Sequence, residues 1–313
     1  MKRLLLGLAA LAAATCGMAE SALAACSITL RNVTAATFTS SQRYSPFTAT
    51  DTAASFTFQV RHPNGQATCS YFVTFSTGNA GTYTRRFANG SNLLQYQIYD
   101  SPAKNSILKA VPGALTGEVI TGSFTSTALA THDKSYYVVI PALQVAVPST
   151  NSYTDSITVR LYEGTLASYT QRDSVTLTFR AGVLASTQVC VACTTAFDNT
   201  MHSHEMNFGT LEAAETKSAT VRVRTNEGYT LFLQSTNRSV LRHTTLNSSV
   251  AYTAQVNGVN VNLTPATQVQ VARVSGVTAA QGVAFDVKVI IGAVNTALAG
   301  NYADSITVTV TAF

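Results

Sequence analysis

Apolar and polar residues alternate along most of the chain, with a period of two residues. In the first half this alternation covers Phe56–Arg61, Tyr71–Ser76, Leu94–Tyr99, Tyr136–Ile140 and Ser174–Phe179. Turn signals such as Pro63-Asn64-Gly65 and Asn89-Gly90 separate these stretches, and no stripe with a helical period follows the N-terminal segment. A period of two is typical of β-strands that bury one face, so we predict antiparallel β-strands.

The second half of the chain repeats this plan. Its expected strands are Met206–Gly209, Ala219–Arg224, Tyr229–Gln234, Val250–Val256 and Phe285–Ile291. Short strands rich in Thr, Val and Tyr, separated by turn signals, are typical of β-sandwiches. The fold class predicted is therefore all-β, with two immunoglobulin-like antiparallel sandwiches.

One phrase occurs twice, as Tyr153–Val159 (YTDSITV) and as Tyr302–Val308 (YADSITV). The first copy is followed by the alternating stretch Ser174–Phe179, which can close the first sandwich, whereas only five residues follow the second copy. We therefore expect the second sandwich to lack its last strand and to expose an apolar groove. The groove residues expected are Ile306, Val308, Val310 and Phe313. The alternative is a second sandwich that is complete with fewer strands.

Residues 1–24 have the features of a secretory signal peptide. Lys2 and Arg3 precede an apolar run that is too short to span a bilayer, and Ala22-Leu23-Ala24 fits a cleavage site. The predicted organisation is a signal peptide (1–24), an N-terminal domain (25–179), a linker (180–189) and a C-terminal domain (190–313). Leu23-Ala24-Ala25-Cys26 also fits a lipoprotein box, so an acylated Cys26 is an alternative.

Four cysteines remain after the signal peptide, namely Cys26, Cys69, Cys190 and Cys193. An even number in a secreted chain indicates two disulfides, and three pairings are possible. The spacing favours Cys26–Cys69 and Cys190–Cys193. A zinc site made by Cys190 and Cys193 with His202 and His204 is the alternative, because two thiolates and two imidazoles form a tetrahedral set.

Composition and motifs argue against several functions. Charged residues make up 11% of the chain and the net charge is +5. Arg85-Arg86 is the one basic pair after the signal peptide, and we interpret it as a solvated strand end, so nucleic-acid binding is not expected. No nucleophile elbow, phosphate loop or cofactor fingerprint is present, so we expect neither an enzyme nor a cofactor nor a bound metal.

At this point the sequence resembles the spore coat protein U domain, the pilin domain of archaic (Csu-type) chaperone–usher pili. The resemblance rests on an early cysteine, Asn207-Phe208-Gly209, Arg86 ahead of Leu94–Tyr99, and Gly300–Ile306. It implies incomplete immunoglobulin-like folds that a partner's donor strand completes. The implied partners are a periplasmic chaperone, an outer-membrane usher and an adjacent pilin subunit that donates the strand.

The resemblance further implies a tip adhesin that is secreted through the periplasm to the pilus tip at the cell surface. Cys26 follows the expected cleavage site so closely that almost no chain is left to donate. The alternatives are a structural spore-coat-like or pilus shaft protein, and a free secreted or lipid-anchored binding protein. The family often pairs its early cysteine with one at the end of the second strand, but Val221–Thr225 has none. Cys190–Cys193 is thus inferred only because no other partner remains.

Loops at the end of the first domain that lies far from the linker are the expected binding surface. Counting strands places Pro63–Thr68, Ser101–Lys134 and the polar loop Glu163–Asp173 there, and Pro141–Pro148 at the near end. The candidate residues for contact with a hydrophobic surface or an unknown receptor are Ile107, Leu108, Val111, Pro112, Leu115, Leu166 and Tyr169. The alternative is that the residues between 101 and 134 form another strand pair in the core.

Overall fold

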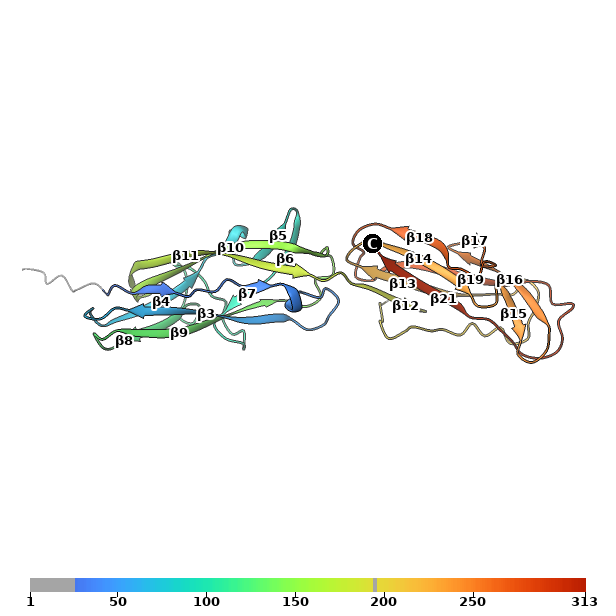
Figure 1. The fold of residues 1–313 in the computed structure, drawn as a ribbon, viewed down its shortest axis with the longest axis horizontal. Coiled ribbons are helices and arrows are strands. Elements are labelled where there is room, and N and C mark those ends of the chain that lie inside the picture. The colour runs from blue at the N-terminus through green and yellow to red at the C-terminus, as the bar shows by residue number, and fades with distance from the viewer. Residues whose placement is uncertain (1–25, 194–195) are drawn as a thin grey trace, which may run out of the picture.

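A computed structural model describes residues 26–193 and 196–313, so the expected signal peptide lies outside the described residues. Strands dominate both halves of the chain (Figure 1). The described helices are two short 3₁₀ turns, η1 (Ser40–Gln42) and η2 (Gly78–Ala80). Neither of them has the length and apolar character that crossing a membrane requires.

Strands β1 to β11 form two sheets that pack face to face, and we call them the N-terminal sandwich. Their bounds are β1 (Thr29–Arg31), β2 (Thr37–Phe38), β3 (Thr52–His62), β4 (Cys69–Phe75), β5 (Arg86–Asn89), β6 (Asn92–Gln95), β7 (Gln97–Tyr99), β8 (Ile120–Phe124), β9 (Ala130–Ile140), β10 (Thr150–Thr165) and β11 (Ser168–Val183). One sheet has the order β1-β3-β9-β7 and the other β2-β11-β10-β4-β8, with β5 and β6 joined to β10.

Strands β12 to β21 form the C-terminal sandwich on a related plan. Their bounds are β12 (Thr187–Val191), β13 (Thr216–Thr225), β14 (Tyr229–Ser235), β15 (Val240–His243), β16 (Ser249–Val256), β17 (Val259–Val261), β18 (Val269–Val274), β19 (Val283–Ile291), β20 (Tyr302–Ala303) and β21 (Ile306–Ala312). One sheet has the order β12-β13-β19-β16-β15-β20, and the other is β18-β14-β21. The prediction of an all-β fold with antiparallel sheets is confirmed.

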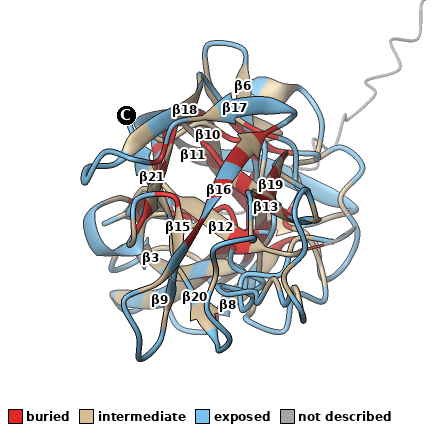
Figure 2. Ribbon diagram, turned by 90° about the vertical axis from the view of Figure 1, so that its right-hand side faces the viewer, coloured by how far each residue is buried: buried red, intermediate tan, exposed pale blue. Residues whose placement is uncertain are grey.

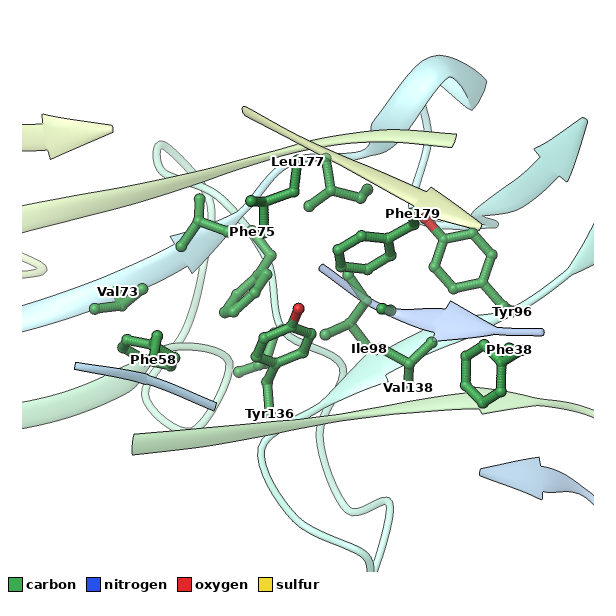
Figure 3. Packing of buried hydrophobic residues seen from close by; sticks show 14 of the residues in the cluster. Phe38, Phe58, Val73, Phe75, Tyr96, Ile98, Tyr136, Val138, Leu177 and Phe179 are labelled. Atoms are coloured by element: carbon green, nitrogen blue, oxygen red, sulfur yellow. The ribbon is translucent and has the colours of Figure 1, made fainter. Parts of the chain in front are cut away.

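Each sandwich has its own hydrophobic core. Aromatic rings fill the N-terminal core, where the ring of Tyr136 lies 4.9 Å from that of Phe75 and 6.0 Å from that of Phe179 (Figure 3). The C-terminal core is largely aliphatic and is built on β13, β14, β16 and β19, and Figure 2 shows buried residues along β13, β16 and β19. The alternation in the sequence produces these cores because it sends every second side chain inward.

Two expected strands differ in the structure. Met206–Gly209 is not a strand, because the Asn207 side chain accepts a hydrogen bond from the Gly209 amide at 2.8 Å and turns the chain. The stretch Leu94–Tyr99 is divided at Tyr96, so that β6 and β7 belong to different sheets. The Tyr96 amide bonds to the Arg85 carbonyl at 3.1 Å, outside either ladder.

Candidate functional site

The first copy of the repeated phrase lies in β10, and the second ends in the corresponding strand β21, although its first two residues, Tyr302 and Ala303, form β20. In the N-terminal sandwich β10 pairs with β4, so that Val159 lies opposite Phe75. In the C-terminal sandwich β21 pairs with β14 in the same antiparallel sense, and Val308 lies opposite Leu233. The sheet order β10-β4-β8 therefore corresponds to β21-β14-β18, and no strand among the described residues takes the place of β11.

An aspartate anchors each copy of the phrase. Asp155 accepts hydrogen bonds from the Tyr96 hydroxyl at 2.7 Å and from the Asn79 amide at 2.8 Å. Asp304 accepts the same kinds of bond from the Tyr252 hydroxyl at 2.6 Å and from the Asn237 amide at 2.9 Å. Burial, together with the charge of Asp155, raises the pKa of Tyr96 well above its usual range, so this hydroxyl remains a donor.

Strand β11 closes the N-terminal sandwich. It pairs with β10 along nearly its whole length and, on its other side, runs parallel to β2 at Arg180 and Ala181. Ile157, Val159 and Leu161 of β10 are consequently 0% exposed. The backbone groups of β10 are therefore paired on both sides, by β11 and by β4.

Strand β21 has an open edge. Among the residues that the structure describes, its one ladder partner is β14, and its other edge pairs with no strand. Ile306, Val308 and Val310 are only half-buried, although they pack against the C-terminal core. Other half-buried apolar residues that contact this core include Val189 of β12, Met206 and Phe208. An unpaired strand edge beside partly exposed core residues is the arrangement that an added strand can complete.

Phe313, the fourth residue of the expected groove, lies at the end of β21. Its amide bonds to the Gly228 carbonyl at 3.0 Å, and its ring packs against Gly228. The guanidinium of Arg273 on β18 lies 3.6 Å from the centre of that ring. Phe313 thus contacts both the turn between β13 and β14 and the strand β18, which lies on the other side of β14.

Three of the expected surface-binding residues come together in a small apolar cluster. Phe72 and Tyr162 are cross-strand neighbours whose rings stack at 5.0 Å, and the edge of the Tyr169 ring meets both. Val111 and Leu166 pack against this cluster, which also contains Val119 and Ala114. We call the residues Phe72, Val111, Ala114, Val119, Tyr162, Leu166 and Tyr169 the aromatic patch.

The other expected residues are placed differently. Leu108 is fully buried in the main core, and Ile107 bridges to Tyr99 at the sheet edge. Pro112 and Leu115 are exposed beside the aromatic patch, and Leu115 is 67% exposed. Residues 107 and 108 therefore extend the core, as the alternative reading of this segment expected, whereas 111–115 lie at the surface.

Two expectations about the loops were wrong. Lys104 forms a salt bridge with Asp51, which also accepts a bond from the Ala142 amide at 2.9 Å, so the segment after Ser101 starts beside the loop of residues 141–148 and not at the far end. Glu163–Asp173 is not a polar loop, because β10 continues to Thr165 and β11 begins at Ser168. The pairing of β10 with β4 on its other side extends to Glu163, which lies opposite Tyr71.

Phe72 and Tyr162 were not among the predicted site residues. The run Tyr71–Phe75 is almost continuously apolar, and β4 is buried on both faces except at its start. Such a run indicates a strand covered on both sides, which is the signal that could have identified Phe72. The cover on the outer face comes from residues 109–119, tied back by the Lys109–Glu118 salt bridge of 2.6 Å.

The loop of residues 141–148 borders an open depression of about 390 Å³. Arg86, Leu93 and Gln95 form its other wall. The Gln144 side chain fixes the loop to β6, since it accepts a bond from the Gln95 amide at 2.7 Å and donates one to the Gln95 carbonyl at 3.0 Å. Leu143 and Leu93 are exposed beside the depression.

Both expected disulfides are present. Cys26 is joined to Cys69, and Cys190 to Cys193. The zinc alternative is wrong, because the sulfurs of Cys190 and Cys193 are bonded to each other and are not thiolate ligands. The same argument excludes a thioether-linked lipid on Cys26, whose sulfur is bonded to Cys69. His62 lies close to Cys26 and Cys69, but their bonded sulfurs are not thiolate ligands.

Comparison with solved structures finds several similar pilus proteins. The chaperone–tip adhesion subunit complex CsuC–CsuE of Acinetobacter baumannii is 16% identical, with a TM-score of 0.42, over 79% of this chain and 85% of that chain. The CupB6 tip adhesin of Pseudomonas aeruginosa is 11% identical, with a TM-score of 0.36, over 91% and 95%. CfaE, the adhesive subunit of CFA/I fimbria of enterotoxigenic Escherichia coli, is 12% identical, with a TM-score of 0.32, over 77% and 81%.

A search of curated protein sequences finds no match. The scan against family models matches residues 9–160 to the Spore Coat Protein U domain. This match agrees with the resemblance carried by the early cysteine and by Arg86 ahead of Leu94–Tyr99, which lie within the matched residues.

Proposed function

We propose that the chain is the tip adhesin of a chaperone–usher pilus, in which the N-terminal sandwich (β1 to β11) binds a surface and the C-terminal sandwich (β12 to β21) accepts a donor strand. The observation that carries the proposal is the contrast between β10, closed on both sides, and β21, open on one. Ile306, Val308, Val310 and Val189 would receive the apolar side chains of the donor.

The first described residues are held within the N-terminal sandwich. Cys26 is tied to Cys69, Ile28 lies in the core, and β1 pairs with β3. These residues are committed to their own sandwich, so they are not free to enter another subunit.

The partners that follow from this proposal act one after another. A periplasmic chaperone would cover the edge of β21 first, because an exposed strand edge is a template for aggregation. An adjacent pilin subunit would replace the chaperone at the outer-membrane usher. The mature protein would then reside at the pilus tip on the cell surface, where the aromatic patch and Leu115 meet a hydrophobic surface.

Fusion of a donor segment to the full chain tests this proposal. A copy of residues 168–183, the sequence of β11, is joined after Phe313 through the turn sequence Leu166-Ala167. A control fusion carries Asp at the positions of Leu177 and Phe179. We expect the donor to raise the unfolding temperature of the C-terminal sandwich in a thermal melt, and the control to leave it unchanged, since Asp cannot fill apolar sites.

The opposite outcome is equally clear. The C-terminal sandwich is complete if the chain without a donor is monomeric and the fused donor leaves the unfolding temperature of this sandwich unchanged. That result would exclude strand acceptance and favour the second candidate, a free secreted binding protein.

A further inference from the structure

The connection between the two sandwiches is built from buried, fully bonded residues. Strand β11 ends at Val183 and β12 begins at Thr187, so the connecting segment is 184–186. The two sandwiches lie end to end along the long axis of the molecule (Figure 1). A connection of this length either acts as a hinge or is held by contacts on both sides.

Asn226, in the turn between β13 and β14, is 0% exposed and supplies most of these contacts. Its side-chain amide donates to the Val147 carbonyl at 3.1 Å and to the Leu184 carbonyl at 2.8 Å. Its side-chain oxygen accepts a bond from the Ser186 amide at 2.8 Å. One side chain therefore ties the C-terminal sandwich to the N-terminal sandwich and to the connecting segment.

The backbone of Asn226 takes part as well. Its amide donates to the Ser186 carbonyl at 3.2 Å, and its carbonyl accepts from the Ser149 amide at 3.3 Å. The Ser149 hydroxyl also donates to the Glu227 carboxylate at 3.2 Å. Every polar group of Asn226 is thus paired, as a rigid buried contact requires.

Phe47 makes a second, independent contact. It is 8% exposed, yet it belongs to neither hydrophobic core. Its ring centre lies 4.7 Å from the guanidinium of Arg224, which stacks at 4.1 Å over Phe197 on its own sandwich. The Gln188 side chain holds that guanidinium through two bonds of 2.9 and 2.7 Å. A cation fixed in this way gives the aromatic contact a set geometry.

We infer that these residues form a fixed joint, with Asn226 as its positioning residue, so that the two sandwiches move as one rigid body. The joint also meets the open strand, because the Phe313 amide at the end of β21 bonds to the carbonyl of Gly228 in the same turn. The aromatic patch and the edge of β21 are accordingly held at a constant orientation. This inference does not depend on the proposed adhesive function.

Backbone ¹⁵N relaxation of the full chain tests the joint. We expect the wild-type chain to show one rotational diffusion tensor for residues of both sandwiches. Asn226→Ala and Asn226→Asp both remove the two amide donations, so each half should tumble faster, with a correlation time that falls toward that of a single sandwich. Phe47→Ala removes the second contact outside either core and should loosen the joint in part.

Asn260→Ala is the matched control, since it alters an exposed asparagine of β17 far from the joint and should leave the relaxation unchanged. Circular dichroism of each variant reports whether both sandwiches remain folded. If Asn226→Ala fails to fold, Phe47→Ala carries the test. Independent tumbling of the two halves in the wild-type chain would overturn the inference, as would wild-type relaxation in both Asn226→Asp and Phe47→Ala.

Discussion

Val159 and Val308 occupy the same position in two copies of one strand, yet Val159 is fully buried and Val308 is half-exposed. Both face an apolar residue of the neighbouring strand, Phe75 or Leu233. The difference arises on the other side, where β11 covers Val159 and no described strand covers Val308.

This contrast predicts that the substitution of Val by Ala lowers the free energy of unfolding more at position 159 than at position 308. Val159→Ala should lower the free energy of unfolding by about 2–3 kcal/mol, because it removes buried methyl groups and leaves a cavity. Val308→Ala should cost less than about 1 kcal/mol in the absence of a donor, since its side chain is already half in water. Chemical denaturation of the two variants measures both values. Equal costs would show that Val308 is as well enclosed as Val159.

The buried aspartate of the repeated phrase is expected to be essential for stability. Asp155→Asn replaces an acceptor of the Tyr96 hydroxyl and the Asn79 amide by a group that also carries two donors. One buried donor is then left unpaired, at a cost of about 2–3 kcal/mol in the free energy of unfolding. Asp133→Asn, at an exposed position of β9, is the control and should change stability little. A small effect of Asp155→Asn in denaturant unfolding would contradict this role.

Arg85 joins the end of β4 to the segment at Leu108, and its replacement should lower the free energy of unfolding. It is fully buried and donates to the carbonyls of Ser76 at 2.9 Å, Phe75 at 3.2 Å and Leu108 at 2.6 Å. Burial lowers its pKa to about 10, so it is still protonated at neutral pH. Arg85→Lys keeps the charge but loses the planar fork of donors, at a cost of about 3 kcal/mol.

Arg86→Lys is the matched control for this change, because its side chain is only half-buried. Urea unfolding of the two variants should separate them clearly. If Arg85→Lys unfolds like Arg86→Lys, the carbonyl contacts of Arg85 contribute little to stability.

His132 should make the N-terminal sandwich less stable in mild acid. Its Nδ1 lies 2.8 Å from the Tyr71 hydroxyl, and burial together with the charge of Lys134 lowers its pKa below the ordinary value of 6.5. The unfolded chain therefore binds more protons near this pH, and the stabilising contribution present above pH 6.5 is lost as the pH falls. His132→Gln should flatten the dependence of the unfolding free energy on pH between about 5 and 7.

The carboxyl groups of Asp51 and Glu118 do not interfere with this measurement. Hydrogen bonds from Lys104 and Lys109, respectively, lower their pKa values from ordinary values of 3.8 and 4.5. The stability that these two carboxylates contribute is therefore lost only in more acidic solution than the range in which His132 titrates. An unchanged pH slope in His132→Gln would assign the acid sensitivity to another group.

The exposed side chains at the aromatic patch should govern attachment. Leu115 is 67% and Tyr169 is 38% exposed, and transfer of the exposed part of each side chain to an apolar surface is favourable by about 1–2 kcal/mol. Leu115→Ser and Tyr169→Ser should each reduce retention on an alkyl-coated surface by roughly tenfold or more. Leu298→Ser, which changes a leucine that is 52% exposed in the C-terminal sandwich, is the control. Equal losses in all three variants would mean that attachment is not localised at the patch.

The sequence by itself indicated the all-β fold, most of the core strands and the favoured pairing of the four cysteines. Alternation with a period of two depends on neighbouring residues, so it can be read along the chain, and Ile157, Val159 and Leu161 show it plainly. The repeated phrase also indicates that β10 and β21 are equivalent strands. The alternation does not indicate where a strand ends when a side chain takes a backbone hydrogen bond that a neighbouring strand would otherwise make. Asn207 does this when it accepts the bond from the Gly209 amide and turns the chain.

Only the tertiary structure decided where the connections lie and which polar residues are buried. Arg85 was interpreted as a solvated strand end, but it is enclosed because the backbone at Phe75 on β4 and at Leu108 after β7 meets around it. The aromatic patch forms because residues 109–119 fold back over Phe72 and Tyr162. Such contacts join residues far apart in sequence, and local periodicity carries no information about them. The same holds for Asn226, an ordinary turn residue in the sequence that becomes the centre of a joint only when two sandwiches meet around it.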